Sequence, residues 1–145
     1  MYRGNRPRGL ARVLNRFAAW QFASGLASRD RDVTLQVRGR KSGAIVSVPV
    51  VIVDHAGHRY LVSMLGEDAN WVRNVRHAQG RAALKRRTTE QVTLTEEPPR
   101  ERAPILKRYL DVAPGARPHF PVARHESLAE FAAVAHEFPV FRIDP

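Results

Sequence analysis

The sequence predicts a small α+β barrel of six antiparallel strands, with helices near the start, the middle and the end of one domain. Three observations predict this class. The 145 residues suffice for one compact domain spanning 1–145, but not for two ordinary ones. Several short runs are β-branched and apolar, or alternate between apolar and polar residues, as strands do. Other segments repeat their apolar residues every three or four positions, which is typical of amphipathic helices.

The N-terminal segment divides into a tail and a helix. Residues 1–9 are expected to form a flexible basic tail, and residues 10–26 have the spacing of an amphipathic helix. The apolar positions of this helix include Leu10, Val13, Leu14 and Phe17. We expect the helix to cover the edge of the sheet. The alternative is a basic helix that lies on an anionic bilayer.

Residues 33–63 have the period of strands. Residues 33–38 alternate strictly, residues 45–53 are almost wholly apolar, and residues 59–63 form a third, shorter run. Short turns that contain glycine separate these runs, so we expect a three-stranded antiparallel meander. Pro49 cannot donate a hydrogen bond to a sheet, which places it at an edge, at a bulge or where another group meets the backbone.

A helix and two strands are expected in the middle of the chain. Residues 70–77 resemble a short helix, with Asn70 as the N-cap. Residues 82–85 and 91–95 then have the composition of two further strands.

The last third of the sequence predicts two helices and a closing strand. The pair Pro98-Pro99 opens a helix in which Pro104 is tolerable only within the first turn. A mobile loop rich in proline and glycine is expected over residues 113–122. Ser127 then stands three residues before a glutamate, which is the spacing of a helix N-terminus. Residues 139–143 predict the last strand.

The chain carries 24 Lys and Arg against 14 Asp and Glu, a net charge of +10. Three clusters hold the excess: the arginines of residues 3–16, the bases of residues 38–41, and the bases of residues 73–87, among which no acid stands. Such a balance predicts an anionic partner, either nucleic acid, a membrane surface or a phosphorylated small molecule. For any single arginine the alternative is a solvated surface position.

Several kinds of chemistry are excluded by the composition. With no cysteine, the chain has no disulfide, thiolate nucleophile or zinc–thiolate site. His55 and His58 lie at a hairpin turn without a third ligand, so no metal site is expected. The nucleophile pattern Gly-x-Ser-x-Gly is absent. No run approaches the ~18 apolar residues of a membrane span. Polar residues interrupt the apolar stretch near the start, so we expect no targeting peptide and a cytoplasmic location.

The turn Gly39-Arg40-Lys41-Ser42-Gly43 has the composition of a phosphate-binding loop. Its glycines free the backbone, two side chains supply positive charge and the serine supplies a hydroxyl donor. An ordinary basic hairpin turn is the alternative. Nucleic acid is disfavoured as the anion, because the basic strand near Lys85 carries no interleaved aromatic residues on which bases could stack.

Several motifs together carry a family likeness, which covers about residues 10 to 143. They are Gly39-Arg40-Lys41-Ser42-Gly43, Val48-Pro49-Val50, Tyr60-Leu61-Val62-Ser63, the Gly66 loop, Asn70-Trp71-Val72-Arg73-Asn74-Val75 and Pro139-Val140-Phe141-Arg142-Ile143. In order and spacing they resemble the deazaflavin-dependent nitroreductase family, whose members include quinone reductases that use coenzyme F420. The Arg-Lys-Ser turn combined with the Trp-x-x-Asn helix is the most specific part.

The resemblance implies a six-stranded split β-barrel related to flavin-binding barrels, and often a homodimer. It implies an enzyme that passes a hydride from reduced F420, an 8-hydroxy-5-deazaflavin, to a quinone, an enone or a nitro compound. FMN is the alternative cofactor. The alternative function is a non-catalytic protein that sequesters the deazaflavin or a flavin. A peripheral contact of residues 1–26 with the inner face of the membrane also stays open.

The resemblance also assigns residues to the cofactor. They are Arg40, Lys41, Ser42 and Gly43 at the phosphate, Val48, Pro49 and Val50 at the ring, Ser63, Met64, Leu65 and Gly66 in the facing loop, and Asn70, Trp71, Arg73 and Asn74 on the phosphate and ribityl side. Since the cofactor carries the chemistry, no catalytic side chain is required. Tyr109, Arg117 and His119 are candidates for protonating or orienting the acceptor.

Overall fold

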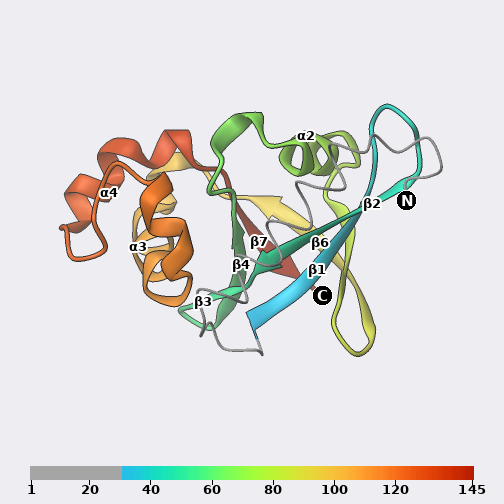
Figure 1. Cartoon of the computed structure of the whole chain (residues 1–145), viewed down its shortest axis with the longest axis horizontal. Helices are drawn as coiled ribbons and strands as arrows, with labels where there is room; N and C mark the ends of the chain where they lie inside the picture. Colours follow the sequence, from blue (N-terminus) through green and yellow to red (C-terminus); the bar gives the residue numbers. More distant parts are fainter. Residues whose placement is uncertain (1–30) are drawn as a thin grey trace.

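A seven-stranded antiparallel sheet organises the part of the chain that the computed structural model describes, residues 31–145 (Figure 1). The strands are β1 (Asp32–Arg38), β2 (Ile45–Val51), β3 (Val53–His55), β4 (His58–Val62), β5 (Arg81–Lys85), β6 (Thr89–Glu96) and β7 (Val140–Asp144). Their order is β2-β1-β5-β6-β7-β4-β3. The expected tail over residues 1–9 and helix over residues 10–26 lie outside the described residues.

Within residues 31–145, three α-helices and four short 3₁₀ helices connect the strands. They are η2 (Gly66–Asp68), α2 (Asn70–His77), η3 (Pro99–Glu101), α3 (Ala103–Val112), η4 (Pro114–His119), α4 (Leu128–Val134) and η5 (Ala135–Glu137). In Figure 1, α3 and α4 lie together on one side of the sheet and α2 lies apart from them. Within residues 31–145, no helix has the length and apolar character that crossing a bilayer requires. The predicted α+β split barrel is confirmed.

The second apolar run closes the barrel by changing partners. Its first half, β2, pairs with β1, and its second half, β3, pairs with β4, with a single residue, Ile52, between them. The Ile52 N–H donates to the carbonyl of Arg31 over 2.8 Å, just before the chain turns away. The prediction of six strands was therefore wrong, and so was the prediction of a three-stranded meander. A run that is almost wholly apolar does not reveal where a strand exchanges one neighbouring strand for another.

Pro49 lies on an edge strand, which is one of the three kinds of position expected for it. It stands opposite Thr34 of β1, and β2 has no other partner among the described strands. Its missing N–H therefore removes no hydrogen bond from an inner ladder.

Two hydrophobic cores share the sheet. The barrel core contains Leu35, Leu61 and Phe141 and is closed at one end by Val72 and Val75 of α2. The helix core lies on the other face and contains residues of α3, α4, β3, β4 and β7, which are Val53, Tyr60, Val62, Leu106, Leu110, Phe131 and Val140. Because neighbouring residues of a strand face opposite sides, β4 and β7 contribute to both cores. This double burial explains their nearly continuous apolar sequences.

The helix termini agree with the sequence in two places and differ in one. Ser127 is the N-cap of α4, and its hydroxyl oxygen accepts from the Glu130 N–H. Pro104 falls within the first turn of α3. The predicted N-cap of α2 was wrong, because Ala69 occupies the cap position and Asn70 is the first helical residue. The Asn70 side chain has a tertiary partner instead, which is described below.

Candidate functional site

The turn between β1 and β2 satisfies its own backbone. Gly39 N–H donates to the carbonyl of Ala44 over 2.7 Å, and Gly43 N–H donates to the carbonyl of Gly39 over 2.9 Å. Gly43 has a φ of 76°, which favours glycine. The Ser42 hydroxyl oxygen accepts from the Ala44 N–H over 3.1 Å. The hydroxyl proton of Ser42 and the ammonium of exposed Lys41 therefore remain available as donors to a ligand.

Arg40 joins this turn to α2. Its backbone N–H and its Nη1 donate to Oδ1 of Asn74 over 3.1 Å and 2.8 Å. Its Nη2 donates to Oδ1 of Asn70 over 3.3 Å, and Nη1 also reaches the Asn70 carbonyl at 3.5 Å. Asn74 is only 4% exposed, so its amide oxygen is a fixed anchor. The Arg-Lys-Ser turn and the Trp-x-x-Asn helix are thus joined through Arg40, Asn70 and Asn74, which we call the Arg40 constellation.

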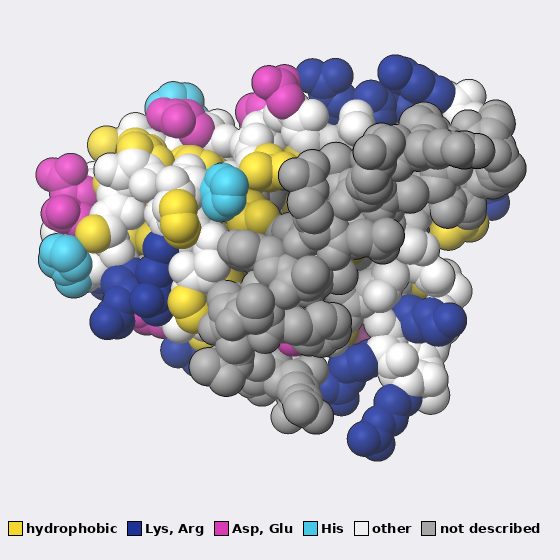
Figure 2. Space-filling model, viewed as in Figure 1, with side chains coloured by type: hydrophobic (Ala, Val, Ile, Leu, Met, Phe, Trp, Pro, Cys, Tyr) yellow, Lys and Arg dark blue, Asp and Glu magenta, His cyan; other side chains and the backbone are white. Residues whose placement is uncertain are grey.

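The amides around Arg40 satisfy its donors without cancelling its charge. A carboxylate in the same place would neutralise the guanidinium, whereas the Asn70 and Asn74 amides are neutral. The guanidinium also lies against the first turn of α2, where a helix favours negative charge. Figure 2 shows lysine and arginine side chains gathered over the hairpin that joins β1 and β2. The residues present fit an anion such as a phosphate.

The loop between β4 and η2 is folded onto itself and onto the helix core. The Ser63 hydroxyl donates to the carbonyl of Gly66 over 2.7 Å. Gly66 has a φ of 83°, and a Cβ there would lie 3.2 Å from the Glu137 carbonyl oxygen. Met64 is buried in the helix core, whereas Leu65 is 60% exposed. Of the four predicted loop residues, Leu65 is therefore the one that offers an apolar surface to a ligand.

The residues expected at the cofactor ring face different directions. Val48 and Val50 pack into the barrel core, and Pro49 lies between them on the opposite face of the edge strand. Trp71 of α2 packs on Phe141 with ring centroids 5.6 Å apart. None of the residues that the resemblance assigns to the cofactor lines either of two surface hollows, of about 540 and 420 Å³, found in the described structure. The turn and α2 are brought together, and the residues expected at the ring line neither of these two hollows.

Arg73 and Arg76 on α2 are engaged by carboxylates. Arg73 pairs with Asp68 over 2.8 Å. Arg76 pairs with Glu67 of η2 over 2.8 Å and with Glu96 of β6 over 2.6 Å. The Arg76 guanidinium holds the pKa of the Glu67 carboxyl below its ordinary value. These two arginines fix the loop before α2, and the basic cluster over residues 73–87 is not one continuous anion path.

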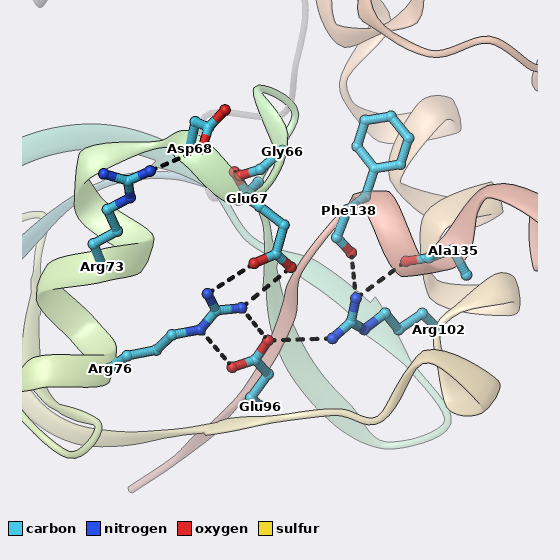
Figure 3. Close-up of polar contacts among 10 residues, drawn as sticks. Gly66, Glu67, Asp68, Arg73, Arg76, Glu96, Arg102, Ala135 and Phe138 are labelled. Atoms are coloured by element: carbon cyan, nitrogen blue, oxygen red, sulfur yellow. Dashed lines mark hydrogen bonds and ion pairs between the residues drawn. The ribbon is translucent and has the colours of Figure 1, made fainter.

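Arg102 continues this network into the protein and was missed by the sequence analysis (Figure 3). It is 4% exposed, and its Nη2 lies 3.2 Å from the Glu96 carboxylate. Its remaining donors reach the carbonyls of Glu97, Ala135 and Phe138 at 2.8, 3.1 and 3.3 Å. One signal could have revealed it, since Arg102, the N-cap residue of α3, stands four residues before buried Leu106 and so precedes the apolar face of that helix.

The three candidate catalytic residues lie in or near the helix core. Tyr109 is buried against Phe120, and burial raises the pKa of its phenol. Arg117 donates from Nε to the Leu110 carbonyl over 2.8 Å, which ties η4 to α3. His119 is the last residue of η4. The expected mobile loop over residues 113–122 thus contains a 3₁₀ helix.

Comparison with known proteins shows the fold. The chain matches no family model, and no curated protein is significantly similar to it in sequence. Among solved structures, an F420-H2 dependent reductase is 18% identical over 79% of this chain and 94% of its own, with a TM-score of 0.51. A chain described as a domain-swapped dimer is 17% identical over 96% and 100%, with a TM-score of 0.54.

A NimC/NimA family protein from Clostridium acetobutylicum is 10% identical over 93% of this chain and 81% of its own, with a TM-score of 0.55. At these identities the likeness concerns architecture. The chain therefore has the split β-barrel fold that an F420-H2 dependent reductase also has.

Proposed function

We propose that this protein is an oxidoreductase that transfers a hydride from reduced F420 to a small organic acceptor, such as a quinone, an enone or a nitro compound. One observation carries the proposal: the glycine-flanked Arg-Lys-Ser turn is docked on the Trp-x-x-Asn helix through Arg40, Asn70 and Asn74. The shared fold with an F420-H2 dependent reductase supports it.

The chain's own residues bind and orient the cofactor in this proposal. Lys41, Ser42 and the Arg40 guanidinium hold the phosphate, and Asn74 keeps Arg40 in place. Leu65 covers the ring from the loop, and the open edge of β2 around Pro49 offers its backbone. The bound deazaflavin supplies the hydride chemistry. Arg73 and Arg76 act by holding α2 and the loop in position.

A non-catalytic sequestering protein is the second candidate. Two of the three candidate catalytic residues support it, because neither is placed to protonate an acceptor. Burial raises the pKa of the Tyr109 phenol, and Arg117 is bound to a backbone carbonyl. A carrier of this kind would bind the cofactor tightly without passing its hydride to any acceptor.

A fluorescence titration tests the proposal first. We expect F420 to bind more tightly than FMN, and reduced F420 to be oxidised when members of a quinone, enone and nitro-compound panel are added. Binding without oxidation supports the sequestering function instead. No binding of F420 at micromolar concentrations would overturn the proposed reductase, and no binding of FMN either would overturn the sequestering function as well.

The Lys41→Ala variant tests the phosphate assignment. We expect its Kd for F420 to rise about tenfold, because one charge-assisted hydrogen bond to the phosphate is lost. Lys85→Ala is the matched control, since Lys85 is also exposed and lies at the end of β5 away from the turn. Equal affinities of the two variants would count against the assignment.

The proposal includes a cytoplasmic homodimer. A solved structure of this fold described as a domain-swapped dimer supports the dimer. Sedimentation equilibrium of the full chain measures it directly, and a mass of one chain, 16.4 kDa, at all concentrations would exclude it. A separate experiment tests contact of residues 1–26 with the membrane, by flotation of the protein with anionic vesicles with and without added salt.

A further inference from the structure

A hollow of about 540 Å³ lies where the sheet meets the C-terminal end of α2. We call it the outer hollow. Its polar lining residues in the described part of the chain are Gln36, Arg38, His77, Arg81 and Gln91, and the other described lining residues are apolar. No acid stands among the described lining residues, which gives the outer hollow a net charge of +2 with His77 neutral.

Two arginines of the outer hollow come from opposite positions on neighbouring strands. β1 and β5 are antiparallel with Gln36 opposite Ala83, and the same register continued by two residues sets Arg38 opposite Arg81. Side chains in directly opposite positions begin about 5 Å apart, and like charges placed so destabilise a sheet. The fold therefore keeps two positive charges together at a cost in stability.

No carboxylate of residues 31–145 compensates these two charges. Arg38 donates from Nη1 to the Gly43 carbonyl over 2.5 Å, and Arg81 donates from Nη1 to Oε1 of Gln79 over 3.4 Å. Neither arginine forms an ion pair within the described residues, and both side chains are exposed. Because a guanidinium has five N–H donors, most donors of Arg38 and Arg81 remain available to a ligand.

The floor of the outer hollow lies between two side-chain amides. Ala83 of β5 pairs with Gln36 of β1 on one side and with Gln91 of β6 on the other, so the three residues form one row across the sheet. The short alanine side chain leaves the centre of this row low. Neither glutamine amide has a hydrogen-bond partner within residues 31–145. The row therefore adds neutral donors beside the two arginines.

We propose that the outer hollow binds a small soluble phosphate monoester. Arg38 and Arg81 hold the phosphate oxygens, Gln36 and Gln91 donate beside them, and the carbon body lies against apolar residues such as exposed Ile45. Charge favours this class of ligand. A phosphate monoester carries about −1.5 to −2 at pH 7 and balances two arginines. A carboxylate or a phosphodiester carries a single negative charge and leaves one arginine unbalanced.

The outer hollow is separate from the proposed cofactor phosphate site. The Arg40 guanidinium contacts Asn70 in the first turn of α2, whereas the outer hollow reaches His77 in the last turn. Seven residues of helix separate these two positions by about 10 Å. Neither Lys41 nor Ser42 lines the outer hollow. The proposal therefore does not rest on the proposed function.

Glycerol 3-phosphate is the probe, titrated into the full-length ¹⁵N-labelled protein and followed by amide chemical shifts. We expect saturable shifts at Gln36 and Ala83. Dimethyl phosphate carries one charge and glycerol carries none, so both are expected to bind at least about tenfold more weakly. Equal binding of dimethyl phosphate would show a general attraction for anions, such as a nucleic-acid backbone, and would overturn the proposal. Flotation with phosphatidate vesicles without binding of glycerol 3-phosphate would assign the phosphate to a lipid surface and overturn the soluble ligand.

A matched pair of variants on β5 locates the phosphate. Arg81→Gln is expected to weaken glycerol 3-phosphate binding by at least about tenfold. Lys85→Gln removes one charge from an exposed position of the same strand outside the outer hollow, and its Kd is expected to change by less than about twofold. Equal losses in both variants would show that only the general charge of the protein matters and would refute the site.

Thermal unfolding in phosphate-free buffer gives a second measure of the same variant. Because Arg81→Gln relieves the repulsion by Arg38, we expect its midpoint to equal or exceed that of the unchanged protein. A lower midpoint would show that Arg81 serves the fold, and would remove the reason to expect a ligand between the two arginines.

A competition experiment separates the outer hollow from the cofactor site. The shifts at Gln36 and Ala83 are expected to appear also in Lys41→Ala and in the presence of saturating F420. Displacement of glycerol 3-phosphate by F420 would assign the outer hollow to the cofactor and overturn a separate site. Binding of glycerol 3-phosphate at Gln36 and Ala83 in a protein that does not bind F420 would leave this inference standing while the proposed function fails.

Discussion

Among the glycines of residues 31–145, Gly80 is the one at which the surrounding backbone leaves least room for a side chain. It has a φ of 83°, and a Cβ there would overlap the carbonyl oxygen of Leu94. Gly57 has the same φ with open space around it. We expect Gly57→Ala to lower the free energy of unfolding by about 1 kcal/mol and Gly80→Ala by at least about 3 kcal/mol. Urea unfolding of both variants measures the difference. Equal losses in the free energy of unfolding would show that β6, which carries Leu94, moves to make room for the Cβ.

Arg102 is expected to be important for stability because of where it lies. Arg102→Met would leave the carbonyls of Ala135 and Phe138 without their donor and lower the free energy of unfolding by about 3 kcal/mol. Arg100→Met is the control, since that side chain is 80% exposed and is expected to change stability by less than about 0.5 kcal/mol. A loss below that of the control would show that water replaces the guanidinium.

Single residues show where sequence reasoning reaches its limit. Arg100, Glu101 and Arg102 form one polar stretch, and composition does not tell which of them is buried. Asn70 has the chemistry of a helix cap, yet Arg40, thirty residues earlier in the chain, determines where its side chain lies. Both outcomes depend on contacts between distant segments.

At the scale of the element, α2 and the preceding loop are joined by the Arg76–Glu67 ion pair. Arg76 lowers the pKa of Glu67, so this pair stabilises the fold above the ordinary glutamate pKa of 4.5, and the stabilisation is lost as the pH falls through the lower folded value. In Arg76→Gln we expect the pKa of Glu67 to rise toward 4.5. Carboxyl NMR titration measures it.

Arg73→Gln is the control for that titration. It removes a neighbouring charge of α2 that pairs with Asp68, and the pKa of Glu67 is expected to stay low. An equal rise in both variants would assign the effect to the general charge of the helix.

The strands were predicted more closely than their partners. The runs over residues 82–85, 91–95 and 139–143 each match a strand of the structure within two residues at either end, because alternation is a local signal. The sheet order joins β1 to β5 and β6 to β7, and those pairings depend on chain closure over long distances. The exchange of partners at Ile52 leaves no mark in the sequence, because the residues on both sides of it are apolar.

At the scale of the whole molecule, the two cores are expected to unfold together. Leu35 of the barrel core and Leu106 of the helix core are both fully buried, and β4 and β7 line both cores. Leu35→Ala and Leu106→Ala should each lower the free energy of unfolding by about 3 kcal/mol in one cooperative transition.

Two probes test this cooperativity in a Trp20→Phe background. Trp71 fluorescence then reports the barrel core, where this residue packs on Phe141, and far-ultraviolet circular dichroism reports the helices. The two urea transitions should coincide in both variants. Separate midpoints would show that the cores are independent units.

The single-residue connection at Ile52, between β2 and β3, also affects the width of the barrel. Because β2 and β3 are consecutive pieces of one strand, the circumference at this seam depends on the length of backbone between Val51 and Val53. One extra residue there would shift β3 against β4 by one position and exchange its two faces, turning Asp54 toward the helix core and Val53 toward solvent. The connection at Ile52 therefore tolerates no single-residue insertion without reversing β3, whereas an insertion of two residues would restore the facing of its side chains.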